Sequence, residues 1–188
     1  MEHKKTILFI EGEPNSPNGD LRQGFAKLLE KKVGGKLPKI IFGAGKTQTI
    51  DKFLNNRLNA DSFLLLVDLD GPENTRDSDL SKYKLTNRSS DVFYMIQEME
   101  AWFISQPDIL DDFYGKDNNG KKVSEKLTKR EIGEIDDPKG ELKKATKTSQ
   151  KGVYQEISHG VELLKRLDTD RLCNAFIDVK NLIERLKQ

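Results

Sequence analysis

The stretch from residue 62 to residue 72, SFLLLVDLDGP, constrains the fold of this chain more than any other. A short apolar run that ends in turn residues is typical of a buried strand in a parallel sheet. Asp68 and Asp70 stand at the carboxyl end of this predicted strand, and open α/β sheets bind their ligands at that end. Because residues i and i+2 of a strand lie on the same side, we expect both carboxylates to enter one small volume.

Two carboxylates held in one small volume repel each other unless a cation lies between them. Oxygen ligands without a nearby His or Cys favour Mg²⁺ or Mn²⁺ over Zn²⁺. The sequence therefore predicts a metal site with Asp68 and Asp70 as ligands. The alternative interpretation is structural: Asp70-Gly71-Pro72 is a turn, and Asp68 is simply the last residue of a strand.

The rest of the chain alternates predicted strands and helices. A polar loop at 15–20, with Asp20 as N-cap, leads into the first helix. Strand, helix, strand, helix and strand in that order predict a mostly parallel, four-stranded α/β sheet with flanking helices. The strands are expected at 6–10, 40–42, 62–69 and 92–96, and helices at about 21–33, 49–58, 97–105 and 107–114.

The sequence divides near residue 115. We expect an α/β core at 1–115 and, at 116–188, a lysine-rich linker and a C-terminal helical extension packed on that core. Apolar spacing in the extension predicts an antiparallel pair of helices at 153–167 and 170–186. The polar segment 71–91 is predicted to be a long mobile loop beside the site, either with or without a short turn of helix.

Charge and composition exclude several classes of protein. The 188 residues include 32 Lys and Arg against 31 Asp and Glu, a net charge of +1, so no bulk attraction to nucleic acid or anionic membrane is expected. No apolar run approaches the roughly 18 residues of a membrane span, and no signal peptide is evident. Cys173 is the single cysteine, which excludes a disulfide within the chain. These features predict a cytoplasmic protein with no membrane partner.

Further acidic residues are expected at the same edge of the sheet. Glu11 ends the first predicted strand, and if the first and third strands are neighbours it joins the two aspartates. Glu98 and Glu100 open a helix after the fourth strand, where acidic residues either complement the helix dipole or serve the site. Glu13 could also reach the site, although a turn role before Pro14 is an equal alternative. A Glu beside a metal ion can act as general acid or base.

Two basic features are candidate phosphate contacts. Gly43-Ala44-Gly45-Lys46-Thr47 lacks the first glycine of a Walker A loop, but a glycine-rich turn before a helix offers backbone amides to a phosphate. Lys46 is therefore either a phosphate contact or part of a simple turn. The second feature is a basic stretch that is either a solvated helix face or a phosphate clamp over the site. It contains Lys143, Lys144, Lys147 and Lys151, with Tyr154 and His159 nearby.

These residues also carry a family resemblance. Ile10-Glu11-Gly12 and Asp68-Leu69-Asp70 resemble the TOPRIM fold of topoisomerases, primases and OLD-type nucleases. That resemblance implies Mg²⁺ held by one Glu and a D-x-D pair. Over nearly the whole chain, the sequence resembles the TOPRIM-related bacterial family called domain of unknown function 4276. This resemblance is carried by YMIQEMEAWFI at 94–104, by Tyr114-Gly115, and by Ala145-Thr146-Lys147, Lys151-Gly152-Val153-Tyr154 and His159-Gly160.

The combined prediction is a Mg²⁺- or Mn²⁺-dependent TOPRIM-type phosphodiesterase that acts on nucleic acid. Glu11, Asp68 and Asp70 would hold the metal, and Glu100 would be an auxiliary acid. Lys46, Lys147 and Lys151 would bind phosphates. The family resemblance implies an ATPase partner and a role in phage defence. Two alternatives stay open, namely a non-catalytic partner subunit of an ATPase and an enzyme that acts on small nucleotides.

Overall fold

The computed structural model describes residues 5–13, 21–35 and 37–188, so the predicted loop at 15–20 and the Asp20 cap lie outside the described residues. Within these ranges, four strands form one sheet in the order β2-β1-β3-β4, and each neighbouring pair is parallel. The predicted α/β fold with a parallel four-stranded sheet is thus confirmed. The strands are β1 (Thr6–Glu11), β2 (Lys39–Gly43), β3 (Ser62–Asp68) and β4 (Val92–Met95).

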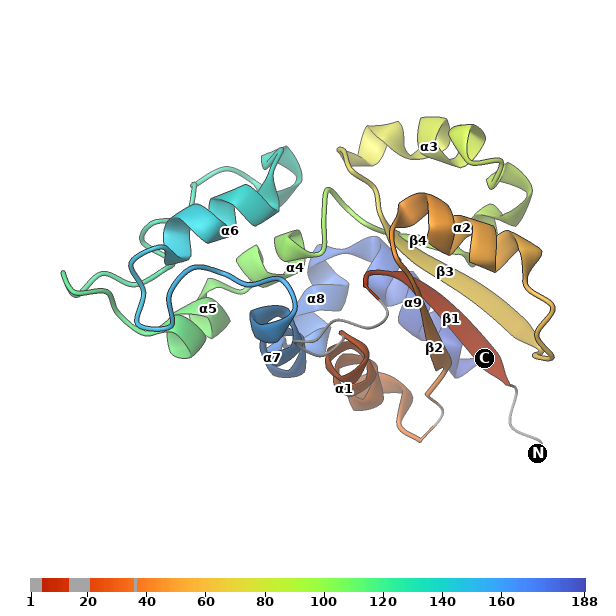
Figure 1. Ribbon diagram of the computed structural model, residues 1–188, viewed down its shortest axis with the longest axis horizontal. Helices are drawn as coiled ribbons and strands as arrows, with labels where there is room; N and C mark the ends of the chain where they lie inside the picture. The colour runs from red at the N-terminus through yellow and green to blue at the C-terminus, as the bar shows by residue number, and fades with distance from the viewer. Residues whose placement is uncertain (1–4, 14–20, 36) are drawn as a thin grey trace.

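Alternate strand residues build a hydrophobic core on each face of the sheet. Leu8 and Ile10 belong to the cluster formed with α1 and α9, whereas Ile7 and Phe9 belong to the cluster formed with α2 and α3. This alternation follows from the period of two along a strand. The sheet therefore lies between two layers of helices (Figure 1). These are α1 (Arg22–Val33), α2 (Lys46–Asn55), α3 (Arg76–Lys82) and α9 (Ile177–Lys187).

The junction between β2 and α2 is packed too closely for a side chain. A Cβ atom on Gly43 would lie 2.2 Å from Thr49 Oγ1 and 2.5 Å from Thr49 Cα. A glycine at this position therefore lets α2 begin directly after the strand. This close packing brings Lys46, the first residue of α2, to the carboxyl edge of the sheet.

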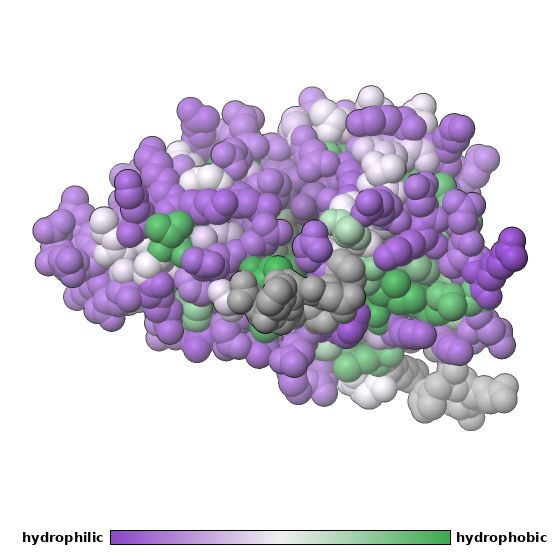
Figure 2. Space-filling model, in the orientation of Figure 1, coloured by the Kyte–Doolittle hydropathy of each residue, from purple (hydrophilic) through white to green (hydrophobic). Residues whose placement is uncertain are grey.

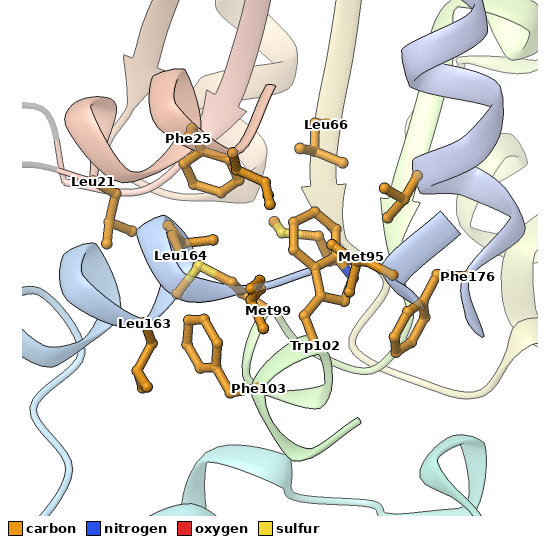
Figure 3. Packing of buried hydrophobic residues seen from close by; sticks show 14 of the residues in the cluster. Leu21, Phe25, Leu66, Met95, Met99, Trp102, Phe103, Leu163, Leu164 and Phe176 are labelled. Atoms are coloured by element: carbon orange, nitrogen blue, oxygen red, sulfur yellow. The ribbon is translucent and has the colours of Figure 1, made fainter. Parts of the chain in front are cut away.

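The helices after β4 share the core of the sheet rather than forming a separate one. Trp102 contacts Phe25 of α1 and Phe176, with ring centroids 6.2 and 6.4 Å apart, and Leu164 of α7 packs into the same cluster (Figure 3). Aromatic contacts of this kind add to the stabilisation that burial provides. The remaining α-helices are α4 (Glu100–Ile104), α5 (Pro107–Tyr114), α6 (Pro138–Thr146), α7 (Ser158–Arg166) and α8 (Thr169–Ala175).

The segment 71–91 is not the long loop that its polar composition predicts. It forms α3 between two 3₁₀ helices, η1 (Glu73–Thr75) and η2 (Thr86–Asp91). Leu80 and Leu85 are buried in the cluster that contains Ile7 and Phe9. Two well-placed leucines are enough to anchor a short helix that otherwise consists of polar residues.

The C-terminal helices also differ from the predicted pair. The segment 170–186 is split into α8 and α9, because Phe176 between them has extended backbone angles (φ −131°, ψ 109°). α7 packs against α1, and α9 packs against β4, so the expected antiparallel pairing of the last helices is wrong. Because this part of the chain packs on the α/β elements themselves, tertiary contacts determine where the helices break.

Two predicted helices have different ends. α2 covers 46–55 instead of 49–58, and Leu54 and Leu58 are exposed. α4 begins at Glu100, so residues 97–99 precede the helix. Such boundary shifts are common where a short apolar pattern is the main signal.

The face of the molecule seen in Figure 2 is mostly hydrophilic, with scattered hydrophobic groups. In the parts of the chain that the structure describes, no helix combines the length and the apolar character needed to cross a membrane.

Candidate functional site

Glu11 and Asp68 lie side by side at the carboxyl edge of the sheet. β1 and β3 are hydrogen-bonded neighbours, as the strand order requires for the two acids to meet. The Asp68 backbone N–H donates to Glu11 Oε2 at 3.1 Å. This side-chain hydrogen bond links the two strands just beyond their last paired residues, Ile10 and Leu66. Burial raises the pKa of Glu11, and the Asp68 amide offsets part of that effect. The condition on which the meeting of Glu11 and Asp68 depended, that the first and third strands are neighbours, is thus met.

Asp68 is the centre of the acidic cluster, which we define as Glu11, Asp68, Glu98 and Glu100. Its Oδ1 accepts a hydrogen bond from the Met99 amide at 3.0 Å. Burial raises the pKa of Asp68 well above its usual value, and the charges of Glu11 and Glu100 raise it further. An acidic side chain with these neighbours is strongly biased towards its neutral form unless a cation is close.

Asp70 does not share the environment of Asp68. β3 ends at Asp68, and Asp70 has a left-handed backbone with φ of 57°, so strand alternation no longer applies to it. Its Oδ2 instead accepts a hydrogen bond from Lys46 Nζ at 3.1 Å. The expectation that Asp68 and Asp70 point into one volume as strand neighbours is therefore corrected.

The residues at this edge match a divalent cation only in part. Glu11 and Asp68 supply oxygen ligands of the type that Mg²⁺ and Mn²⁺ prefer, in a partly buried and negatively charged place. Among residues 5–13, 21–35 and 37–188, however, no three Asp, Glu, His or Cys side chains are arranged to hold a metal ion. The metal site with Glu11, Asp68 and Asp70 stays a prediction. It would require Asp70 to face Glu11 and Asp68, whereas in this structure Asp70 is bonded to Lys46.

Lys46 is not poised for a substrate in this conformation. Its ammonium donates to three acceptors: Leu69 O at 3.2 Å, Asp70 Oδ2 at 3.1 Å and Asp79 Oδ1 at 2.8 Å. Burial alone would lower the pKa of Lys46, but its hydrogen bonds to Asp79 and Asp70 raise that pKa above its usual value. The lysine is therefore a charged, internally paired group, which neither of its predicted roles anticipated.

Glu98 and Glu100 connect the sheet to the helical part of the chain. Glu98 Oε2 accepts from the backbone N–H of Lys139 in the first turn of α6, so it complements α6 rather than α4. Glu100, the first residue of α4, is 2% exposed and accepts from the Tyr154 hydroxyl at 2.8 Å. Burial raises the pKa of Glu100 to about 7, and the charge of Lys139 limits that rise. Glu100 is thus an acid that can change protonation state near neutral pH.

Lys139 is a site residue that sequence reasoning missed. Its ammonium pairs with Glu156 at 3.0 Å. Burial would lower the pKa of Lys139, but the charge of Glu100 and the bond to Glu156 raise it above the usual value. Asp137-Pro138 is a recognisable helix start, and the Asp137 side chain does cap α6 by accepting from Gly140 N. That signal locates the helix but not its proximity to Glu100.

The other two lysines that were predicted to bind phosphates are Lys147 and Lys151. Lys147 follows the end of α6 and is exposed, and Lys151 Nζ lies 4.8 Å from the centroid of the Phe113 ring. Glu13 is exposed and lines a cavity of about 220 Å³ together with Glu156. This cavity places Glu13 on the same side of the molecule as the partner of Lys139, and its predicted roles stay open.

Of the three comparisons with known proteins, one found a match. Neither the search of curated proteins nor the search of solved structures found a match to this chain. Residues 20–187 match the family described as Domain of unknown function (DUF4276). That match covers most of the chain, including β2, β3, β4 and every helix from α1 to α9, and the chain therefore belongs to the DUF4276 family.

Proposed function

We propose that this protein is a divalent-metal-dependent phosphodiesterase of the TOPRIM type that acts on nucleic acid, with an ATPase as its partner in phage defence. The observation that carries the proposal is the partly buried Asp68 carboxylate beside the charges of Glu11 and Glu100. Keeping these acids together at one sheet edge is costly, and a bound cation would offset that cost. The resemblance of Glu11 and the D-x-D pair to the TOPRIM pattern favours Mg²⁺ or Mn²⁺.

Each residue of the site has a defined part in this proposal. A bound metal ion would supply a phosphate-neutralising charge and a water of lowered pKa. Glu11 and Asp68 would hold that ion through their carboxylates. Glu100, with a pKa of about 7, is suited to give a proton to the leaving oxygen or take one from the attacking water.

Lys139 is the cation best placed to contact a substrate phosphate. Its side chain is 29% exposed and its ammonium stays charged beside Glu100 and Glu156. A phosphate that displaced Glu156 would gain a charge-assisted hydrogen bond. This assignment shifts the proposed phosphate contact from Lys147 and Lys151 towards the acidic cluster.

The test is hydrolysis by wild type and Asp68→Asn, with Mg²⁺ and with Mn²⁺. Substrates are single-stranded DNA, duplex DNA, RNA and bis(p-nitrophenyl) phosphate. We expect Asp68→Asn to lose at least about 100-fold in rate, and an exposed control, Asp112→Asn, to match wild type. Equal rates in wild type and Asp68→Asn would end the proposal. Cleavage confined to the small diester would favour the small-nucleotide alternative.

Two observations favour a second candidate, a non-catalytic partner subunit of an ATPase. In the described ranges the acids do not form a three-ligand group, and the net charge of +1 is low for a protein that binds nucleic acid alone. Calorimetry with Mn²⁺ separates the two candidates. If the protein is a non-catalytic partner subunit, we expect no Mn²⁺ binding that depends on Asp68.

A further inference from the structure

We propose that Lys46 is an internal counter-ion that holds Asp70 away from Glu11 and Asp68, and that a divalent cation at the acidic cluster draws Asp70 away from Lys46. Lys46 is then a positioning residue that sets the affinity of the site for its cation. This inference rests on the proposed function, because it requires a cation at Glu11 and Asp68.

The environment of Lys46 is built for a fixed positive charge. Its side chain is 8% exposed, and its ammonium meets the oxygens of Leu69, Asp70 and Asp79. The same nitrogen lies 5.4 Å from the ring centroid of Tyr83 and 5.9 Å from that of Tyr94. Carboxylates and aromatic faces together stabilise a buried ammonium strongly.

The two acidic partners of Lys46 differ in how firmly they are held. Asp79 is 11% exposed, and it also accepts a hydrogen bond from the Tyr94 hydroxyl at 2.8 Å. Asp70 is 61% exposed and bonds Lys46 over a longer distance, 3.1 Å against 2.8 Å for Asp79. Water can replace Asp70 far more readily than it can replace Asp79. Asp70 is therefore the exchangeable partner, and Asp79 is the permanent one.

The backbone around Asp70 permits this exchange without refolding. Asp70 N donates to Gln97 O, and Gln97 N donates to Gly71 O, so the ends of β3 and β4 are tied together. The exchange then needs a rotation of the Asp70 side chain. The charge of Asp70 already raises the pKa of both Glu11 and Asp68, so its carboxylate lies within electrostatic range of both acids.

The exchange would complete the set of ligands that the present conformation lacks. With Asp70 turned from Lys46 towards Glu11 and Asp68, three carboxylates would face one cation, whose attraction offsets their mutual repulsion. Lys46 would keep Leu69 O and Asp79 as acceptors. Its remaining N–H would then be free for an anionic ligand such as phosphate.

The test is a mutant cycle read by calorimetric titration with Mn²⁺. The variants are Lys46→Met/Asp79→Asn, Asp70→Asn and the triple variant. The paired change removes one positive and one negative charge, so the local net charge stays constant. We expect Lys46→Met/Asp79→Asn to bind Mn²⁺ about tenfold more tightly than wild type, and this gain to vanish when Asp70→Asn is added. An absent gain, or an equal gain in both backgrounds, overturns the proposal.

Mn²⁺ binding by Asp68→Asn separates this inference from the proposed function. If Asp68→Asn binds Mn²⁺ as well as wild type does, the cation site itself fails, and both proposals fall. If Asp68→Asn abolishes binding but the Lys46 cycle shows no coupling, the inference about Lys46 alone is wrong.

A measurement on the unsubstituted protein guards against misfolded variants. Side-chain carboxyl ¹³C resonances are followed while Mg²⁺ is added to wild type and to Asp68→Asn. We expect the Asp70 resonance to shift in wild type and to stay in place in Asp68→Asn. An Asp70 resonance that does not move at saturating Mg²⁺ contradicts the exchange.

Discussion

Two groups of acidic side chains at one sheet edge have opposite electrostatic environments in this fold. Asp79 and Asp70 share a buried ammonium, that of Lys46, and Asp79 is also hydrogen-bonded to Tyr94. Asp68, by contrast, has a backbone amide for a partner and the charges of Glu11 and Glu100 for neighbours. The first group is hydrogen-bonded directly to an ammonium, whereas the hydrogen-bond donor to Asp68 is a backbone amide. An uncompensated group of this kind is typical of functional sites, where stability is given up for chemistry.

The comparison is tested most strongly by removing the internal cation. Lys46→Met leaves Asp79 as an unpaired acid that is 11% exposed, so we expect the free energy of unfolding to fall by about 3–5 kcal/mol in urea titrations at pH 7. Adding Asp79→Asn should restore much of the loss. Lys52→Met is the matched control on α2, because Lys52 bonds a backbone oxygen, Phe42 O. A loss below about 1 kcal/mol for Lys46→Met would contradict the conclusion that Lys46 compensates the negative charges of Asp70 and Asp79.

The pH dependence of stability tests the uncompensated group. The pKa of Glu100 is about 7 in the folded protein, against an ordinary value of 4.5 for a glutamate. Between these pH values the folded state binds more protons than the unfolded state, so the free energy of unfolding should fall as pH rises. The whole effect is at most about 3 kcal/mol.

Glu100→Gln should remove this part of the pH dependence, because a glutamine does not titrate in this range. The glutamine can still accept the hydrogen bond of Tyr154, so the local packing is kept. Chemical unfolding at a series of pH values between 4.5 and 8 measures it. Glu30→Gln, in an exposed pair with Lys27, serves as the control and should leave the slope unchanged. The same slope in wild type and Glu100→Gln would show that Glu100 does not titrate in this range.

The smallest expected effect has the opposite sign from that of Lys46. Asp68→Asn removes a partly buried acid whose charged form is disfavoured by its acidic neighbours, so in metal-free buffer at pH 7.5 it should raise the free energy of unfolding by about 1–2 kcal/mol. Added Mg²⁺ should raise the melting temperature of wild type but not that of Asp68→Asn, because ligand binding to the native state is stabilising. A less stable Asp68→Asn would mean that the carboxylate is structurally satisfied.

The helical part of the chain was harder to predict than the sheet. Leu80 and Leu85 are too few to reveal the helix within 71–91, because a short amphipathic signal is lost among polar residues. The break at Phe176 is equally invisible, since the apolar spacing continues across it. Both features depend on which surface the segment packs against. Local propensity sets only a weak preference for such short helices.

The sequence by itself determined the strands, their parallel arrangement and the presence of Glu11 and Asp68 at the carboxyl ends of two of them. These features could be predicted because buried strands of a parallel sheet are recognisable as continuous apolar runs. Only the tertiary structure decided the partners of the charged residues. Lys46 and Asp79 are 33 residues apart, and Lys139 and Glu98 are 41 residues apart. Pairing over such separations depends on how the helices pack and on where β3 ends, and a linear pattern of residues carries neither.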